Sequence, residues 1–382
     1  MTTTAETDVA ATPKRFNINF GALIMEGRAL VALLVIIAIF ALMNDNYLSS
    51  GNLATIAKDV AFNAIIALGM LLVILKGGID LSVGSTVGLT GAVAGNLFQG
   101  VSLPLTDAVM YPSLWVIVVL AVGVGMLVGW VNGILISRLN LAPFIVTLGM
   151  LYVGRGLTQV LLGGTNITNE LRGQEGLNNE GLFTIFASSP LGVPISAWVM
   201  VALAVVFSIL LTRTPFGRWL YATGSNERAA ELSGVPVKRV KTRVYIFTGM
   251  CAGMVGILQI ANIRSATADL GSLYELNAIA AVVIGGAALS GGRGTVRGTI
   301  IGAFVIGFLT NGLVIVGVSP FWQTVITGAV IILAVAMDQI QQIIQRRRAD
   351  ARAVAQVRRE SQQQEDEEAA EEPLKSEGQK VH

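Results

Sequence analysis

The chain has 382 residues, of which 53% are hydrophobic and 13% are Asp, Glu, Lys or Arg, and its formal net charge at pH 7 is +2. Soluble domains carry about 25% charged residues, so this composition excludes an ordinary soluble domain and indicates a membrane protein. The single cysteine, Cys251, excludes an intrachain disulfide, and the single histidine, His382, argues against a histidine-based metal or proton site.

Apolar runs recur along the chain at lengths close to the roughly 20 residues that a helix needs to cross a bilayer. About ten such runs are present, so we expect an all-α polytopic membrane protein with about ten transmembrane helices. The predicted spans are 28–44, 58–75, 81–99, 114–136, 142–163, 195–212, 244–263, 276–291, 299–318 and 320–338.

Lysine and arginine are concentrated in alternate loops. The 213–243 loop is strongly basic, whereas 100–113 contains no Lys or Arg. Because short cytoplasmic loops are enriched in these residues, we expect 213–243 and both termini to be cytoplasmic. The chain then divides into a cytoplasmic segment 1–27, a transmembrane domain 28–340 and a charged tail 341–382, which we expect to be cytoplasmic and disordered. A lipid or partner switch is the alternative for the tail.

The stretch "KGGIDLSVGS" breaks an apolar region with Lys76 and Asp80. Glycine permits a tight turn here, so one interpretation is a cytoplasmic interhelical loop with a positive-inside lysine. The other is a discontinuous element near a translocation path, in which Asp80 caps the next helix. "GGIDLSVG" from Gly77 and "GGAALSGG" from Gly285 share a GG-x-x-L-S-x-G pattern, which indicates either internal symmetry or chance similarity of glycine-rich loops.

Polar side chains inside predicted spans are functional candidates, because placing them in lipid is costly. Arg155, with Gln159 one turn further on, either extends to the interface or lines a polar cavity. Glu275 either caps a helix N-terminus or contributes to a pathway. The amides either bind a ligand or join helices. The candidate pathway residues are Asn63, Asp80, Asn96, Arg155, Gln159, Asn262, Glu275, Asn277 and Asn311.

The 213–243 loop contains a predicted short helix within "RTPFGRWLYATGSNERAAELSGVPVKRVK". Ser225 or Asn226 can cap its N-terminus, and Glu227 lies in the first turn, where the helix dipole favours an acid. Gly234, followed by Pro236, ends it. We therefore expect a short helix at the cytoplasmic face. Either it is a simple interfacial helix or it docks a partner.

Four segments carry a resemblance to a known family. "ATGSNERAAELSGV" resembles the cytoplasmic coupling segment of ABC-importer permeases of the ribose, xylose and galactose type. "KGGIDLSVGS", "NLAPFIVTLGMLYVGRGL" and "YELNAIAAVVIGGAALSGGRGTVRGTIIGAFVIGFLTNGL" are similar to other segments of that family, in the same order. The resemblance extends over most of the predicted transmembrane domain.

The resemblance implies the fold of the vitamin B12-type (type II) importer permeases and a place in the bacterial cytoplasmic (inner) membrane. It also implies transport of a sugar or polyol by two permease copies, identical or similar. The implied partners are two cytoplasmic ABC ATPase domains and an extracytoplasmic sugar-binding protein. It implies no cofactor, metal, nucleic acid or catalytic residue. The implied ATPase-coupling residues are Gly224, Ser225, Asn226, Glu227, Arg228, Ala229, Ala230, Glu231 and Gly234.

The chain contains no G-x-x-x-x-G-K-[ST] phosphate loop, so we expect ATP hydrolysis in a separate partner and no enzymatic activity in this chain. A branched-chain amino-acid ABC permease is the alternative within the class, and a gradient-driven secondary sugar transporter is the alternative outside it. An intramembrane enzyme is disfavoured by the lack of a nucleophile–base cluster. Small residues at four-residue spacing, at Gly125, Gly129 and Gly133 or at Gly298 and Gly302, favour close helix contact, here expected between two copies.

Overall fold

The computed structural model describes residues 20–102, 109–167, 181–333, 335–336, 339–340 and 343. The N-terminal segment before residue 20 and nearly all of the predicted 341–382 tail lie outside these ranges. The long helices are α1 (Phe20–Met43), α2 (Ser50–Leu75), α3 (Val83–Gln99), α4 (Leu114–Arg138), α5 (Pro143–Leu161), α7 (Ile195–Arg213), α10 (Val237–Ile263) and α12 (Val296–Ile315). The shorter elements are α6 (Gly181–Phe186), a 3-10 turn (Pro190–Gly192), α8 (Pro215–Ser225), α9 (Glu227–Leu232) and α11 (Tyr274–Ile284).

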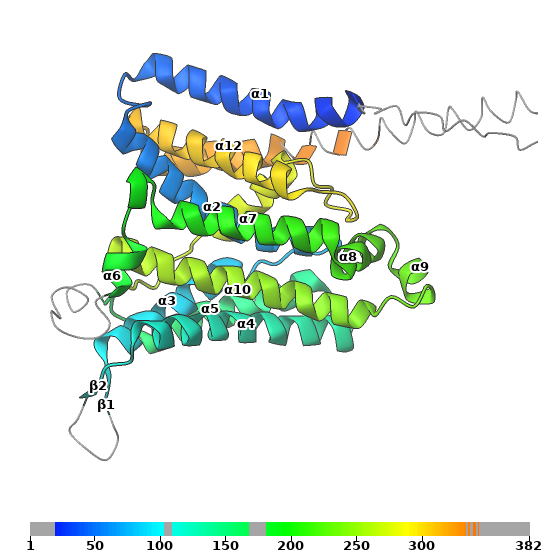
Figure 1. The fold of residues 1–382 in the computed structure, drawn as a ribbon, viewed down its shortest axis with the longest axis horizontal. Helices are drawn as coiled ribbons and strands as arrows, with labels where there is room; N and C mark the ends of the chain where they lie inside the picture. The colour runs from blue at the N-terminus through cyan, green and yellow to red at the C-terminus, as the bar shows by residue number, and fades with distance from the viewer. Residues whose placement is uncertain are drawn as a thin grey trace, which may run out of the picture.

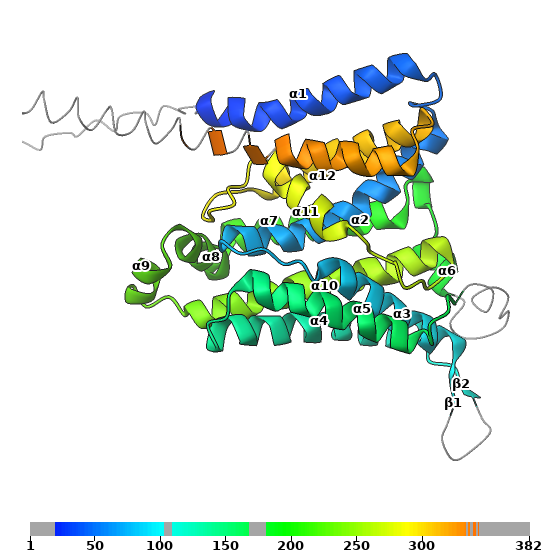
Figure 2. The ribbon, with the colours of Figure 1, turned by 180° about the vertical axis from the view of Figure 1, so that it is seen from behind.

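The long helices run side by side in a bundle, with α1 and α12 at one edge and α4 and α5 at the other (Figures 1 and 2). The α8 and α9 helices lie at one end of the bundle, which we call the α9 end. A small hairpin, in which β1 (Val101–Ser102) pairs antiparallel with β2 (Val109–Met110), projects from the opposite end, which we call the hairpin end.

Among the described residues, six helices are long and apolar enough to cross a membrane: α2, α4, α5, α7, α10 and α12. They agree with six of the predicted spans and make the chain an all-α, multi-pass membrane protein. The other four predicted spans correspond to shorter apolar or glycine-rich helices: Ala29–Met43 within α1, α3, α11 and Pro320–Leu333. The largest departure is at 276–291, because α11 ends at Ile284 and a loop follows.

Burial separates a central helix from peripheral ones. The apolar window of α2 is 83% buried, whereas those of α4 and α5 are only 28% and 22% buried. Large apolar side chains remain exposed on the peripheral helices, among them Trp115, Val119 and Val160. Contiguous exposed apolar surface of this kind is stable in lipid rather than in water, so α2 is the core of the bundle and the outer faces of α4 and α5 suit lipid or another protein.

The small-residue face of α4 packs against α10 of the same chain. A Cβ atom on Gly129 would lie 2.1 Å from the Tyr245 carbonyl oxygen, and one on Gly125 would lie 2.3 Å from that of Gly249. Gly133 similarly faces Thr242. Only glycine permits such close backbone approach. The expectation that this face joins two copies is therefore wrong.

The small-residue face of α12 is also occupied within the chain. A Cβ atom on Gly298 would lie 2.0 Å from the Gly285 carbonyl oxygen, and one on Gly302 would lie 1.9 Å from that of Ala281. This face therefore holds α12 against α11. The expectation that this face joins two copies is also wrong.

Candidate functional site

The predicted short helix in the 213–243 loop is α9, and it begins after Asn226. The Asn226 Oδ1 atom accepts a hydrogen bond from the Ala229 backbone N–H at 3.0 Å, so Asn226, not Ser225, is the cap. Glu227 lies in the first turn, and Gly234 follows the helix with a φ of +81°. That left-handed conformation favours glycine.

The α9 helix presents most of its side chains to solvent. The Arg228 and Glu231 side chains form an i, i+3 ion pair at 3.5 Å and are 80% and 56% exposed. Ala230 is buried against the protein, whereas Leu232 is exposed. The Lys241 ammonium donates to the Glu227 carboxylate and so ties α9 to the start of α10. This arrangement makes α9 a projecting surface element with a fixed base.

A preceding helix, α8, was missed by the sequence reasoning. Thr214 caps it by accepting a hydrogen bond from Gly217 N–H, and Pro215 occupies its first turn. Both residues are typical of helix starts and were the available signal. Two of the predicted coupling residues, Gly224 and Ser225, belong to α8 rather than to α9, and Gly224 faces neighbouring loops instead of solvent.

A buried polar cluster lies at the start of α3. Asp80, 2% exposed, accepts hydrogen bonds through Oδ1 from the Ser82 backbone N–H at 2.9 Å and from its hydroxyl at 2.6 Å. Asp80 therefore orders the N-cap residue Ser82 rather than capping the first turn of α3 itself. Asn132 of α4 donates to the Ser82 hydroxyl at 2.9 Å.

Two further groups of this cluster, Asn132 Oδ1 and the Tyr245 hydroxyl, are buried without a hydrogen-bond partner among the described residues. Buried polar atoms normally have a partner, so this cluster can bind water or a polar solute. Asn132 was missed, although an amide within a predicted span was the same signal that selected Asn63 and Asn96.

The guanidinium of Arg155 in α5 is hydrogen-bonded to the segment between α10 and α11. Its Nη1 donates to the Ala268 and Leu270 carbonyl oxygens at 2.9 and 2.7 Å, and its Nη2 donates to the Ser272 hydroxyl at 3.0 Å. These acceptors belong to the non-helical segment 264–273 between α10 and α11. Carbonyl groups of non-helical backbone need such partners where they are withdrawn from water. Gln159 is exposed and is not part of this network.

The 264–273 segment lies against glycines of α3. A Cβ atom on Gly88 would lie 3.0 Å from the Leu270 carbonyl oxygen, and one on Gly84 would lie 2.2 Å from the Glu275 carboxylate. The Glu275 Oε2 atom is buried without a hydrogen-bond partner among the described residues. Glu275 lies in the first turn of α11, as a helix N-terminus favours, and the structure brings it near Arg155 through α3.

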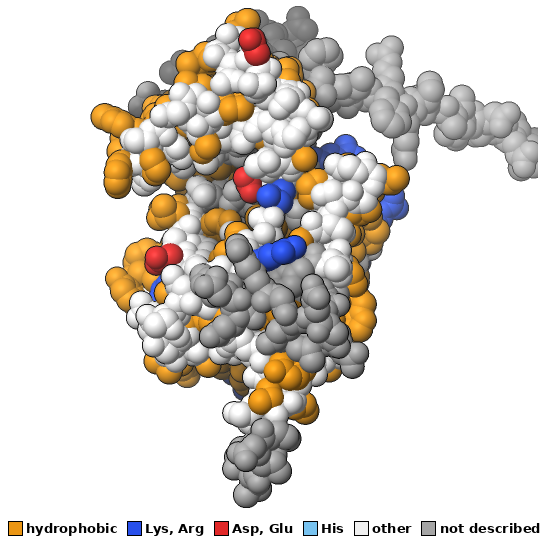
Figure 3. Space-filling view, turned by 90° about the vertical axis from the view of Figure 1, so that its left-hand side faces the viewer, with side chains coloured by type: hydrophobic (Ala, Val, Ile, Leu, Met, Phe, Trp, Pro, Cys, Tyr) orange, Lys and Arg blue, Asp and Glu red, His pale blue; other side chains and the backbone are white. Residues whose placement is uncertain are grey.

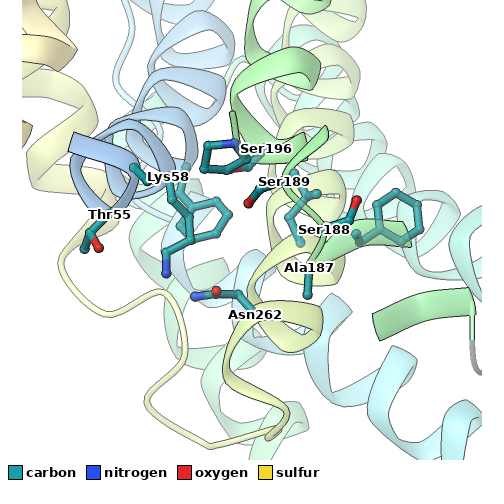
Figure 4. Close-up of a pocket in the computed structure, with 12 residues that line it drawn as sticks. Thr55, Lys58, Ala187, Ser188, Ser189, Ser196 and Asn262 are labelled. Carbon is teal, nitrogen blue, oxygen red and sulfur yellow. The ribbon is translucent and has the colours of Figure 1, made fainter. Parts of the chain in front are cut away.

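A polar pocket with a cavity volume of about 140 Å³ opens at the hairpin end between α2, the α6–α7 connection and α10. Lys58 and Asn262 point toward one another across it, with Ser189 and Ser196 above them (Figure 4). The Ser196 hydroxyl is buried and has no hydrogen-bond partner among the described residues. The aromatic rings of Phe62 and Phe186 complete the lining, which therefore combines apolar faces with hydrogen-bonding groups.

Charged side chains of both signs lie together near the middle of the hairpin end (Figure 3). The surrounding surface is largely uncharged. This end of the bundle therefore carries a small group of charged side chains within a largely uncharged surface.

The remaining candidate amides fall into two groups. Asn311 exchanges hydrogen bonds with Asn52 of α2 at 2.9 and 3.1 Å, and Asn96 donates to the Leu161 carbonyl oxygen at 3.0 Å. These two join helices. Asn63 is half-buried with an unpartnered Oδ1, and Asn277 lies half-buried in the first turn of α11. Asn63 therefore has an oxygen free to bind a ligand, and Asn262 lines the pocket described above.

Within the part of the chain that the structure describes, no group of three or more His, Cys, Asp or Glu side chains is arranged to hold a metal ion. The polar groups are instead hydroxyls, amides and single charges distributed between the two ends of the bundle. A many-helix bundle with an apolar exterior, polar interior clusters and a projecting helix at one end is the architecture of a multi-pass membrane protein.

The chain belongs to the permease family described as "Branched-chain amino acid transport system / permease component", which matches residues 52–335. It is 40% identical to the ribose import permease protein of Escherichia coli strain K12 over 322 residues, covering 84% of this chain and 96% of the relative. It is 35% identical to the galactose/methyl galactoside import permease protein of the same strain over 335 residues, covering 85% and 96%.

A probable ABC transporter permease protein of Sinorhizobium fredii is 37% identical over 293 residues, covering 76% of this chain and 82% of the relative. No solved structure gives a significant match. The resemblance noted in the sequence to sugar-importer permeases is therefore confirmed, and the chain is a multi-pass protein of the inner membrane.

Proposed function

We propose that this chain is the membrane-spanning permease subunit of an ATP-driven ABC importer for a sugar. The observation that carries the proposal is the 40% identity to a ribose import permease over 96% of that relative's length. The matched region includes 84% of this chain. A separate ATPase would supply the energy, and an extracytoplasmic binding protein would deliver the sugar.

The sugar that we propose is ribose. The relatives named for ribose import are 37–40% identical to this chain, whereas those named for galactose import are 35% identical. The pocket with Lys58 and Asn262 supports a small polyol, because hydroxyl and amide groups beside aromatic rings suit the polar edges and apolar faces of a monosaccharide. Its cavity of about 140 Å³ suits one such ring.

In the complete importer, we place the hairpin end outside the cell and the α9 end in the cytoplasm, as the basic 213–243 loop indicates. Ten transmembrane helices in a type II arrangement and two permease copies complete the proposal. The α9 helix would then contact the ATPase. Its exposed Arg228 and Glu231 support this role, because a docking element must present its side chains to the partner.

Uptake by cells that carry the binding protein and the ATPase, with or without this chain, tests the transported solute. We expect chain-dependent accumulation of labelled ribose that excess unlabelled ribose abolishes and excess galactose or leucine does not. Competition by leucine instead would favour a branched-chain amino-acid permease. Competition by galactose alone would change the proposed sugar while leaving the importer class intact.

A charge reversal tests the role of α9. We expect Arg228→Glu to abolish sugar-stimulated ATP hydrolysis by the assembled importer, because it reverses the charge of an exposed α9 side chain. Arg138→Glu is the matched control, since Arg138 is also exposed but lies at the end of α4. Normal stimulation in the Arg228 variant would remove α9 from the ATPase contact.

A further inference from the structure

Three loops that are far apart in the sequence meet beside α9. The Gly292 backbone N–H donates to the Leu75 carbonyl oxygen at 2.8 Å, and the Tyr221 hydroxyl donates to the Gly294 carbonyl oxygen at 2.8 Å. A Cβ atom on Gly77 would contact the Ser290 carbonyl oxygen. We call this meeting point the glycine junction. It consists of Leu75–Gly77, the end of α8 at Gly224–Ser225, and the α11–α12 loop at Ser290–Gly294.

The backbones in the glycine junction touch directly. A Cβ atom on Gly224 would lie 1.8 Å from the Leu75 carbonyl oxygen and 2.7 Å from the Gly292 nitrogen. One on Gly291, whose φ is +88°, would lie 2.8 Å from the Gly224 carbonyl oxygen. No side chain larger than hydrogen fits at Gly224 without displacing a neighbouring loop. The close approach therefore leaves little room for the three loops to move independently.

The position of the glycine junction links α9 to the core of the bundle. Gly224 precedes the α9 cap, Asn226, by two residues, and Leu75 is the last residue of the central helix α2. The α11–α12 loop leads into α12, which packs on α11 through Gly298 and Gly302. A displacement of α9 therefore reaches α2 through the contact between Gly224 and Leu75. It reaches α12 through the contact between Gly224 and the α11–α12 loop.

Charged side chains also lie near these backbone contacts. Lys76, which follows Leu75, is 8% exposed, and Lys241 and Glu227 are the charges that act on it. Glu227 belongs to α9 and accepts a hydrogen bond from Lys241 of α10. The end of α2 thus lies within electrostatic range of the first turn of α9 as well as in contact with the end of α8.

Both copies of the GG-x-x-L-S-x-G pattern reach the junction, although through different positions of the pattern. The first copy reaches the junction through its opening glycine, Gly77, and the second through its closing glycines, Gly291 and Gly292. The glycines of both copies that lie in the junction have positive φ values, at +86°, +88° and +72°. They are therefore required by turn conformation as well as by space.

We propose that the glycine junction is the relay that transmits displacement of α9 to α2 and to the α11–α12 loop, with Gly224 and Tyr221 as positioning residues. The relay rests on the proposed role of α9 as the ATPase contact. Packed elements that meet backbone to backbone move together as a unit. Separating them is therefore expected to uncouple ATP hydrolysis from sugar movement without removing the ATPase contact.

The test compares two junction variants with a control in the complete importer, reconstituted with its ATPase and binding protein. Gly224→Ala forces Leu75 and Gly292 away, and Tyr221→Phe removes only the hydrogen bond to Gly294. Gly123→Ala in α4 is the control, because a Cβ atom there meets nothing within 4 Å. The readouts are ribose transported per ATP hydrolysed and a photo-cross-link to the ATPase from Leu232→benzoylphenylalanine, because Leu232 is an exposed α9 residue.

We expect Gly224→Ala to lower the ribose-to-ATP ratio by about fivefold or more, the size of a typical coupling effect. Tyr221→Phe should lower the same ratio to a smaller extent, Gly123→Ala should not, and the cross-link should persist in all three. If Gly224→Ala fails to assemble, Tyr221→Phe decides the outcome.

An unchanged ratio in the junction variants would overturn the relay. Loss of the cross-link in both junction variants would also overturn the relay, because the junction would then only position α9 at the membrane surface. Absence of the cross-link in the unaltered junction would instead overturn the role of α9 itself, and the relay with it. These outcomes separate a failure of the relay from a failure of the proposed ATPase contact.

Discussion

Replacing Arg155 by Met should loosen the 264–273 segment without unfolding the bundle. The substitution keeps a long apolar stem but removes the donors to the Ala268 and Leu270 carbonyl oxygens and to the Ser272 hydroxyl. A hydrogen bond to a charged group contributes about 1.5–3 kcal/mol. The Ser272 bond is exposed and contributes least, so we expect the free energy of local opening to fall by about 3 kcal/mol.

Hydrogen–deuterium exchange of the permease in lipid nanodiscs measures this opening directly. A loss of about 3 kcal/mol corresponds to roughly 100-fold faster exchange of the amides in 264–273, since 1.4 kcal/mol is a factor of ten. Gln159→Met is the matched control, because Gln159 is exposed on the same helix and does not contact the segment. Equal exchange rates in the two variants would refute the conclusion that the hydrogen bonds of Arg155 hold this segment in place.

Three further outcomes follow from the packing and charges. Gly249→Ala places a Cβ atom 2.0 Å from the Gly125 carbonyl oxygen, so the α4–α10 contact should lose about 2 kcal/mol in a detergent unfolding titration, and an unchanged midpoint would contradict it. Asn52 and Asn311 should show a coupling of about 1 kcal/mol in a double-mutant cycle, and additivity would contradict the pairing. Burial, together with the nearby Lys241 and against the opposing effect of Glu227, lowers the pKa of Lys76 from 10.5 to about 8. Since the folded state then binds the proton less tightly than the unfolded state, thermal stability should rise between pH 8 and pH 10.5, and Lys76→Met should abolish that rise.

The elements with local signals could be predicted from the sequence. An asparagine before an acidic first turn and a glycine followed by a proline defined α9, because caps and stops depend on neighbouring residues only. The long apolar helices were identified by their length. The α8 helix was missed because it contains two glycines, Gly217 and Gly224, which lower helix propensity.

Interactions between distant residues could not be predicted. The acceptors of Arg155 lie 113–117 residues away in the sequence, and its one-turn neighbour Gln159 gave no indication of them. The glycine faces at Gly125 and Gly298 were correctly read as close helix contacts. Glycine spacing indicates that another helix packs closely against these faces, but it does not indicate which helix. The packing of α4 on α10 and of α12 on α11 was therefore seen only in the structure.

The central claim is that this chain moves a sugar at the expense of ATP hydrolysed by a partner. Proteoliposomes that contain this chain with its ATPase, and that are supplied with ribose-loaded binding protein on one face and ATP on the other, test it directly. We predict ribose accumulation against its gradient that requires both ATP and the ATPase and does not respond to an imposed ion gradient. Accumulation driven by an ion gradient in vesicles that contain this chain alone would contradict the account.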